Sequence, residues 1–403
     1  MGIIAVIVQR VPVSDFSRSI DWQTVDRTIS PRSEGIVKDG TMRITGITVQ
    51  MIRFERPYFH WCDDLPVPPT TVTSPFLRIC TDEGVEGHCL GATDVVDAGV
   101  DSVATLLIGA DPFDRERIWH RFWKAARWRG YQGRLGTVDV ALWDLVGKIV
   151  GQPVYKLLGG YRDEMPAYAS TLTLDSVQEY EDLALQCVER GYSAIKLHVW
   201  GKADRDLQAC RAVRKVVGDD VVLMLDSSSM YTLEEATWMG RALEEMNYYW
   251  FEEPIDHFNL TGLAELSNRL KIPLAVAEST NGSVYDAATH LKMGAGEIVL
   301  TDPLFKAGFT GSIKTAHLWE AFGLRCAVHG SDVACLHAAL AIPSCRYFES
   351  WVPEGILQTH GIRTAATEID PNGVVRPWQT PGLGMELDWD WLNAHTVQTI
   401  VSS

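Results

Sequence analysis

Acidic residues recur at a regular spacing in the second half of the chain, each directly after a short apolar run. Asp226, Glu252 and Glu278 follow the runs VVLML, YYWF and PLAVA, and each interval is 26 residues (252 − 226 and 278 − 252). Such an interval holds a strand, a helix and two loops, so the three carboxylates are expected at the carboxyl ends of successive parallel strands. A single acidic residue there is often only solvated or caps the next helix. Three in register predict a site for a hard cation such as Mg²⁺.

Two pairs of polar residues and one further acid lie on the neighbouring predicted strands. Lys196 and His198 stand two residues apart, so their side chains point to the same face of a strand. Seen alone, this pair would be explained as well by a surface lysine and a core histidine as by a functional role. A lysine buried beside a cation would have a depressed pKa and could act as a base or a donor. Asp302 and His329 end consecutive strands, where the carboxylate would fix the tautomer of the imidazole and raise its basicity. Glu349 is predicted to end the last strand and to hydrogen-bond a substrate carboxylate oxygen.

The elements that must position these residues alternate between strand and helix from Met165 onwards. Eight strands are predicted at 165–170, 193–199, 221–226, 249–253, 274–278, 297–302, 325–329 and 345–349. Helices are predicted in the gaps, at 176–190, 203–217, 233–245, 260–270, 284–293, 311–322 and 334–341. This rhythm indicates an α/β barrel of the (β/α)8 type with an irregular last unit.

The rest of the chain has a different character. Residues 1–40 are polar and irregular and are predicted to be an N-terminal extension. Residues 41–164 combine alternating strand patterns, a hairpin at Asp82–Gly84 and helices at 97–107, 114–128 and 136–150, which predicts an α+β domain. The barrel is expected at 165–355. From His360 the rhythm is lost, and residues 356–403 are expected to fold back on the first domain.

Composition narrows the class of protein. The chain has 403 residues, a formal net charge of −16 and a pI of about 5.1, so nucleic acid and anionic membranes are not expected partners. Its eight cysteines include no CxxC pair and are expected to be buried free thiols, as in a reducing cytosol. No apolar run approaches the length of a membrane span. The expected location is therefore cytoplasmic.

The order Lys-x-His, Asp, Glu, Glu, Asp, His and Glu on consecutive strands resembles the enolase superfamily, mandelate racemase subgroup. The similarity covers about residues 42–360 and includes VDVALWDLVGKIVGQPVYKLLGG at 138–160, VGDDVVLMLD at 217–226 and WFEEP at 250–254. It implies an N-terminal α+β capping domain, completed by the C-terminal segment, over a modified TIM barrel, (β/α)7β. It also implies one Mg²⁺ on Asp226, Glu252 and Glu278, and removal of the proton α to a carboxylate. By analogy of fold, a homo-oligomer between dimer and octamer is expected.

The chain departs from the subgroup pattern at three positions. His198 stands where the racemase pattern has a second lysine, which puts a two-base racemisation in doubt. Ala277 replaces a glycine that often precedes the third metal ligand, and Thr301 replaces a glutamine before Asp302.

These features favour dehydration of a sugar acid to a 2-keto-3-deoxy acid through an enediolate. Polar residues expected at the mouth, His60, His88 and Lys306, suit hydroxyl groups, whereas Trp61 and other aromatic residues would suit an apolar wall. One alternative is a racemase, epimerase or cycloisomerase that acts on a hydroxy acid or lactone through the same enediolate. A non-catalytic barrel is the remaining alternative. The capping loops are expected to determine which substrate binds.

Overall fold

The computed structural model describes residues 42–126, 135–278, 280, 284–353 and 360–403. The predicted N-terminal extension, residues 1–40, lies outside the described residues. Among the helices that the structure describes, none combines the length and the apolarity that a membrane crossing requires. All eight cysteines are free thiols, and all except Cys80 are buried.

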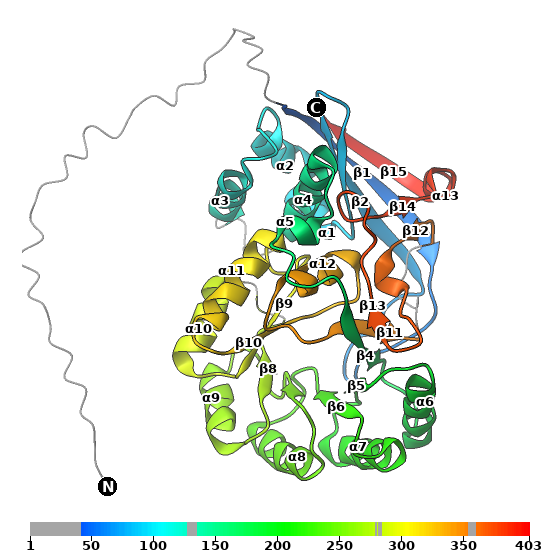
Figure 1. Cartoon of the computed structure of the whole chain (residues 1–403), viewed down its shortest axis with the longest axis vertical. Helices are drawn as coiled ribbons and strands as arrows, with labels where there is room; N and C mark the ends of the chain where they lie inside the picture. Colours follow the sequence, from blue (N-terminus) through cyan, green and yellow to red (C-terminus); the bar gives the residue numbers. More distant parts are fainter. Residues whose placement is uncertain (1–41, 127–134, 279, 281–283, 354–359) are drawn as a thin grey trace, which may run out of the picture. The chain divides into compact units, whose positions relative to one another are not determined.

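An antiparallel sheet forms the first part of the fold, as Figure 1 shows. Its strands are β1 (Ile44–Glu55), β2 (Thr71–Thr81), β3 (Glu86–Leu90) and β15 (Thr396–Ser402), in the order β15-β1-β2-β3. The last strand of the chain pairs with the first, from Ile47 opposite Ser402 to Ile52 opposite Thr396. This pairing confirms that the C-terminal segment completes the capping part of the fold.

Five helices follow the first three strands: α1 (Thr93–Ala98), α2 (Val100–Leu107), α3 (Arg115–Ala126), α4 (Gly136–Val150) and α5 (Val154–Leu157). The single helix predicted at 97–107 is wrong in its boundaries, because Gly99 separates α1 from α2. Gly99 has a φ of +84°, a conformation that glycine adopts without steric cost and that no α-helix contains.

The barrel consists of eight strands that alternate with seven helices. The strands are β4 (Met165–Thr171), β5 (Ala194–His198), β6 (Val222–Asp226), β7 (Phe251–Glu252), β8 (Leu274–Val276), β9 (Ile298–Thr301), β10 (Arg325–Val328) and β11 (Phe348–Val352). The helices are α6 (Val177–Glu189), α7 (Ala203–Val217), α8 (Leu233–Glu245), α9 (Leu260–Arg269), α10 (Val284–Met293), α11 (Gly308–Glu320) and α12 (Val333–Ala341). Neighbouring strands pair in parallel from β10 back through β4, and β4 pairs with β11. The predicted (β/α)7β order is therefore confirmed.

The register of the barrel strands explains why the polar residues converge. His198, Asp226 and Glu252 are the last residues of β5, β6 and β7, and they are direct partners in the two ladders. The last strand, however, begins later than predicted. Phe348 pairs with Ala167, so Glu349 is the second residue of β11 and the prediction that it ends the strand is wrong.

Helix α4 carries the first part of the 138–160 motif, residues 138–150, and joins the capping part to the barrel. The carboxylate of Asp139 accepts hydrogen bonds from the backbone N–H and the hydroxyl of Thr310 in α11, at 2.9 and 2.8 Å. The carboxylate of Asp144 accepts from the N–H of His88 in β3 at 2.8 Å and from the N–H of Leu383 at 2.7 Å. The motif thus connects three parts of the chain that are far apart in sequence.

The segment after His360 contacts both parts of the fold. It contains β12 (Ile362–Arg363), η3 (Ala365–Thr367), β13 (Val374–Val375), β14 (Glu386–Leu387) and α13 (Trp389–His395). Strand β13 pairs with β4 of the barrel, while β15 pairs with β1. The predicted domain boundaries at 164/165 and 355/356 stay predictions.

Candidate functional site

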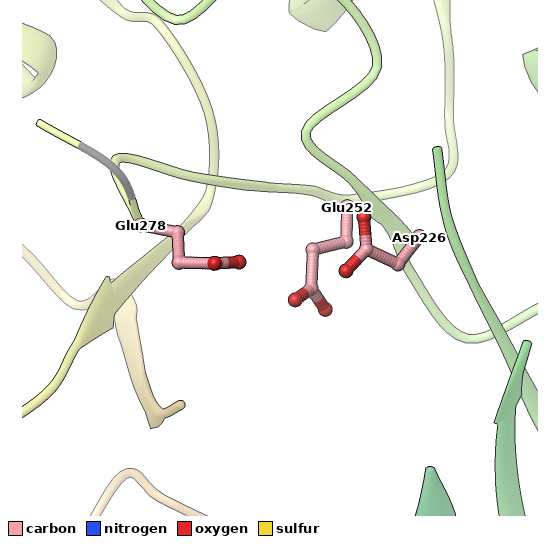
Figure 2. A group of neighbouring side chains, drawn as sticks. All are labelled: Asp226, Glu252 and Glu278. Atoms are coloured by element: carbon pink, nitrogen blue, oxygen red, sulfur yellow. The ribbon is translucent and has the colours of Figure 1, made fainter. Parts of the chain in front are cut away.

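Three carboxylates meet where β6, β7 and β8 end. Asp226 and Glu252 are the last residues of their strands, and Glu278 follows β8 by two residues. One oxygen atom from each lies within 4.8 Å of the others. Figure 2 shows Glu278 reaching toward Asp226 and Glu252 from the opposite side. Oxygen atoms on opposite sides of an octahedral Mg²⁺ are roughly 4.2 Å apart, so small side-chain movements would bring these donors to bonding distance. The donor set and its spacing therefore fit Mg²⁺.

A cavity of about 820 Å³ opens over the carboxylates. Residues of the barrel line one side, including Asp226, Glu278 and His329. Residues of the capping part and the C-terminal segment line the other side, including Phe54, Arg56, Trp61, Leu90, Ile362 and Met385. A ligand in this cavity would be enclosed by segments from both ends of the described chain.

Lys196 lies beneath the carboxylates and is only 1% exposed. Its Nζ is 2.7 Å from Glu252 Oε1, 2.9 Å from Glu349 Oε1 and 3.7 Å from Asp226 Oδ2. Burial opposes its positive charge, but the carboxylates of Glu252 and Glu349 prevail and raise the pKa of Lys196 well above its usual value. In the metal-free protein Lys196 is therefore a cation and a hydrogen-bond donor. The depressed pKa expected beside a bound cation stays a prediction.

His198 is held on all sides. Its Nδ1 is 2.7 Å from the carbonyl oxygen of Thr171, which can only accept, so Nδ1 carries a proton. Its Nε2 is 2.9 Å from Asp226 Oδ2. The rings of Trp61 and Trp351 lie 5.1 and 5.3 Å from the imidazole. Both nitrogen atoms are therefore engaged by the protein itself.

His329 and Asp302 form the predicted pair. His329 Nδ1 is 2.9 Å from Asp302 Oδ2, and Nε2 is 3.4 Å from Glu278 Oε1. Burial opposes the charged form of the imidazole, but Glu278 and Asp302 raise the pKa of His329 well above its usual value. The other oxygen of Asp302 accepts the N–H of Leu304 at 2.6 Å, which fixes the orientation of the carboxylate. The side chain of His329 is 16% exposed, and it lines the cavity.

Glu349 is completely buried, and both of its oxygen atoms are engaged. Oε1 accepts from the hydroxyl of Ser170 at 2.7 Å and from Lys196 at 2.9 Å, and Oε2 accepts from the N–H of Gly330 at 2.6 Å. Burial raises the pKa of Glu349, but Lys196 and His329 lower it more, to about 2. An ionised Glu349 cannot donate to a substrate carboxylate. The contacts instead place it as the residue that holds Lys196.

The residues predicted to bind substrate are only partly brought together. Trp61 lines the cavity, with its ring 4.8 Å from that of Trp351. In the described part of the chain, His60, His88 and Lys306 are not among the residues that line this cavity. His60 is half-buried, with its ring 6.2 Å from that of Tyr58.

The other two residues have partners outside the cavity. His88 lies against Lys148, with Nδ1 3.0 Å from the amine, and against Glu86, with Nε2 3.3 Å from the carboxylate. The buried amine of Lys306 donates to the carbonyl oxygen of Thr280 at 2.8 Å and also to its hydroxyl group. Burial lowers the pKa of Lys306 to about 8.

Glu253 is a residue of the site that the sequence analysis missed. It follows Glu252 directly, is 3% exposed and lines the cavity. Burial and the charge of Glu278 raise the pKa of Glu253 to about 8. Its signal in the sequence was the doubled acid of the WFEEP motif. Strand alternation would send its side chain away from Glu252, but a φ of +39° turns the backbone here.

Several other non-glycine residues near the carboxylates have positive φ. They are Ser228, Ser229 and Ala277, with φ values of 49°, 64° and 75°. Strained backbone of this kind is concentrated at functional sites. The value at Ala277 explains why a glycine suits the position before the third carboxylate.

Comparison with known proteins identifies the family. Residues 70–159 match the mandelate racemase/muconate lactonizing enzyme N-terminal domain, and residues 179–391 match the enolase C-terminal domain-like family. Arabinonate dehydratase of Saccharolobus solfataricus is 30% identical over 331 residues, covering 76% of this chain and 86% of that protein. D-galactarolactone cycloisomerase of Agrobacterium fabrum is 32% identical, covering 78% of this chain and 89% of that protein.

Solved structures agree with the sequence comparisons. D-glucarate dehydratase from Agrobacterium tumefaciens, in complex with magnesium, is 34% identical with a TM-score of 0.81, covering 88% of this chain and 99% of that one. L-talarate dehydratase from Polaromonas, in complex with Mg and L-glucarate, is 28% identical with a TM-score of 0.77, covering 90% and 99%. The chain therefore belongs to the enolase superfamily, in its mandelate racemase/muconate lactonizing enzyme subgroup.

Proposed function

We propose that the protein dehydrates a sugar acid to a 2-keto-3-deoxy acid. The carboxylates of Asp226, Glu252 and Glu278 would hold one Mg²⁺. The observation that carries the choice of reaction is the unequal freedom of the two histidines. Both histidines line the cavity, but the side chain of His329 is 16% exposed and its Nε2 is 3.4 Å from Glu278. The side chain of His198 is only 6% exposed, its Nε2 is 2.9 Å from Asp226, and two tryptophans contact its ring. A racemase of the two-base kind needs a free base on each side of the substrate, but an elimination needs only one.

The chemical difficulty is the weak acidity of a proton α to a carboxylate. When bound, Mg²⁺ would stabilise the second negative charge that develops on the carboxylate oxygens as the enediolate forms. Lys196 is kept cationic by Glu252 and Glu349 and lies beneath the metal-binding carboxylates rather than in the cavity lining, so its positive charge adds to that stabilisation from below. Both cationic groups act where charge develops, which lowers the barrier rather than only tightening binding.

His329 carries the proton in this mechanism. A metal ion on Glu278 would offset the carboxylate charge that does most to raise the pKa of His329, so that a neutral imidazole is available. The Nε2 of His329 takes the α-proton as the C–H bond breaks, and Asp302 stabilises the imidazolium that results. The imidazolium then gives the same proton to the β-hydroxyl group, which leaves as water when the C–O bond breaks. The remaining enol gains a proton at carbon from solvent, loses its O–H proton to solvent and so becomes the 2-keto-3-deoxy acid. The substrate loses one water in all, and His329 returns to its neutral form.

The relatives support a sugar acid as the substrate. Arabinonate dehydratase and D-glucarate dehydratase are named for such acids, and L-talarate dehydratase was solved with L-glucarate. The same comparisons favour one second candidate, because a cycloisomerase is 32% identical to this chain. A cycloisomerase would form the enediolate from a lactone and would keep every oxygen atom of the substrate in its product.

A screen of aldonic and aldaric acids with Mg²⁺ tests the proposal. Dehydration gives a 2-keto acid that semicarbazide detects by absorbance, whereas isomerisation of a lactone gives no loss of water by mass spectrometry. His329→Asn is expected to lose roughly 10²–10⁴-fold in kcat, which is the usual contribution of a general acid–base group. His120→Asn, at an exposed position in α3, is the matched control. Product formation that survives His329→Asn would contradict the mechanism.

A further inference from the structure

Glu253 contacts the turns on both sides of its own strand. Its Oε1 accepts the backbone N–H of Glu278 at 2.9 Å, in the turn after β8. Its Oε2 accepts the hydroxyl of Ser229 at 3.2 Å, in the turn after β6. The side chain therefore spans the distance between the turns that follow the two outer metal-binding strands.

The backbone of Glu253 makes further contacts with the same two segments. Its carbonyl oxygen accepts the N–H of Ser229 at 2.7 Å and the hydroxyl of Ser227 at 3.1 Å. Its N–H donates to the carbonyl oxygen of Ala275 in β8 at 2.9 Å. All five contacts run from one buried residue to the chain segments that carry Asp226 and Glu278.

Both turns have backbone conformations that need such support. Ser228 and Ser229 after β6, and Ala277 before Glu278, have positive φ values. A non-glycine residue in that region persists only where surrounding contacts enforce it. The turn after β6 also orients the first carboxylate, because the N–H of Ser228 donates to Asp226 Oδ1 at 2.8 Å.

We infer that Glu253 is a positioning residue that sets the separation between Asp226 and Glu278. It reaches Mg²⁺ only through these neighbours, so the inference rests on the proposed metal site. Glu278 depends on it most, because Glu278 lies beyond the end of β8 and is the most exposed of the three carboxylates. Side chains that orient metal ligands typically change metal affinity 10–100-fold when they are replaced.

Two substitutions separate the reach of the side chain from its carboxyl group. Glu253→Gln removes the ionisable carboxyl group but keeps the length, and an amide can accept from Glu278 N–H while donating to the hydroxyl of Ser229. Glu253→Asp keeps the carboxyl group but is one methylene shorter, so it cannot hold both turns. Ser229→Ala breaks only one of the two side-chain contacts and serves as a milder variant.

The experiment measures Mn²⁺ binding to the full chain by the electron paramagnetic resonance signal of free Mn²⁺. Thermal unfolding of the metal-free proteins shows that each variant is folded. We expect Glu253→Asp to weaken Mn²⁺ binding by about 10–100-fold, Ser229→Ala by a smaller factor, and Glu253→Gln by no more than about threefold. Should Glu253→Asp not fold, the inference is tested by the other two variants, of which Ser229→Ala should bind Mn²⁺ more weakly than Glu253→Gln.

Three results would count against this inference. Weaker Mn²⁺ binding by Glu253→Gln than by Glu253→Asp would show that the carboxyl group matters and that the length of the side chain does not. Equal affinity in all variants would show that Glu253 does not position the ligands. If the unmodified protein fails to bind Mn²⁺, the proposed metal site fails and this inference fails with it.

Discussion

Replacing Lys196 by methionine tests the electrostatic balance beneath the proposed metal site. The substitution keeps most of the side-chain volume and removes one buried positive charge. It leaves the carboxylates of Glu252 and Glu349 without the amine that lies 2.7 and 2.9 Å from them. Both carboxylates are completely buried, so water cannot take the place of the amine.

The size of the effect follows from these contacts. Removal of one partner from a buried ion pair lowers the free energy of unfolding by about 3–5 kcal/mol. For a unit of roughly 360 residues, the entropy of unfolding is about 0.8 kcal/mol per kelvin. We therefore expect the metal-free Lys196→Met protein to melt about 4–7 °C below the unmodified protein at neutral pH. The deficit should shrink at lower pH, because protonation neutralises the two buried carboxylates that have lost their partner, and burial already raises the pKa of Glu252 well above its usual value.

Thermal unfolding without Mg²⁺ measures the expected fall in melting temperature, and a second measurement with Mg²⁺ tests its electrostatic cause. Mg²⁺ supplies the missing positive charge, so it should raise the melting temperature of Lys196→Met more than that of the unmodified protein. Lys314→Met is the matched control. Lys314 pairs with Glu116 at 2.6 Å on the surface, where such a pair contributes about 1 kcal/mol or less.

Two outcomes would refute the reasoning. Lys196→Met could melt within about 1 °C of the unmodified protein, which would mean that the carboxylates are not charged together in the metal-free state. Alternatively, Lys314→Met could lower the melting temperature as much, which would mean that burial does not determine the effect.

Three further predictions concern stability. Ala277→Gly should raise the free energy of unfolding by about 0.5–1 kcal/mol in urea, because glycine relieves the strain of a φ of 75°. In the metal-free protein, Glu278 and Asp302 raise the pKa of His329 against the effect of burial. His329 therefore stabilises the fold fully below about pH 6.5 and loses this contribution as pH rises through its folded-state pKa. In His329→Asn, this pH-dependent part of the free energy of unfolding between about pH 6 and pH 9 should be absent. Asp144→Ala should lower the free energy of unfolding by about 3–5 kcal/mol, because it leaves its buried donors without an acceptor.

Two of these have a control variant, and each has an opposing result. Ala236→Gly, inside helix α8, should destabilise by about 1 kcal/mol, so a loss at both alanines would contradict the strain argument. Asp219→Asn, at an exposed position, should change the free energy of unfolding little. An equal loss of stability in the Asp144 and Asp219 variants would contradict the connecting role of Asp144. A stability difference between the unmodified protein and His329→Asn that does not change with pH would contradict the assigned cause.

The sequence predicts the part of this fold that depends on periodicity. A buried parallel strand is a short apolar run, and the residue after it lies at the carboxyl end of the barrel, so Asp226 and Glu252 could be located from the pattern alone. The same reasoning failed at Glu349. The run before it resembles a strand, but pairing with β4 selects the segment from Phe348 to Val352. The strand pairing of the whole barrel determines which of the two adjoining apolar segments pairs with β4.

The direction of several side chains could not be predicted. His88, in β3, and Lys306 were expected at the mouth of the barrel, yet their partners lie elsewhere, at Lys148 and Thr280. Glu253 was missed for a related reason, since its direction depends on a positive φ that no propensity for glutamate would suggest. These positions are determined by tertiary contacts, which a single sequence does not contain.

The pairing of β15 with β1 has a consequence for how the protein is made. Ribosomal synthesis runs from the N-terminus, so all eight barrel strands emerge before residues 396–402. Strand β1 waits for its second neighbour until residues 396–402 have been made, with a row of backbone donors and acceptors unpaired. The capping wall of the cavity can therefore be completed only after all eight barrel strands have been made.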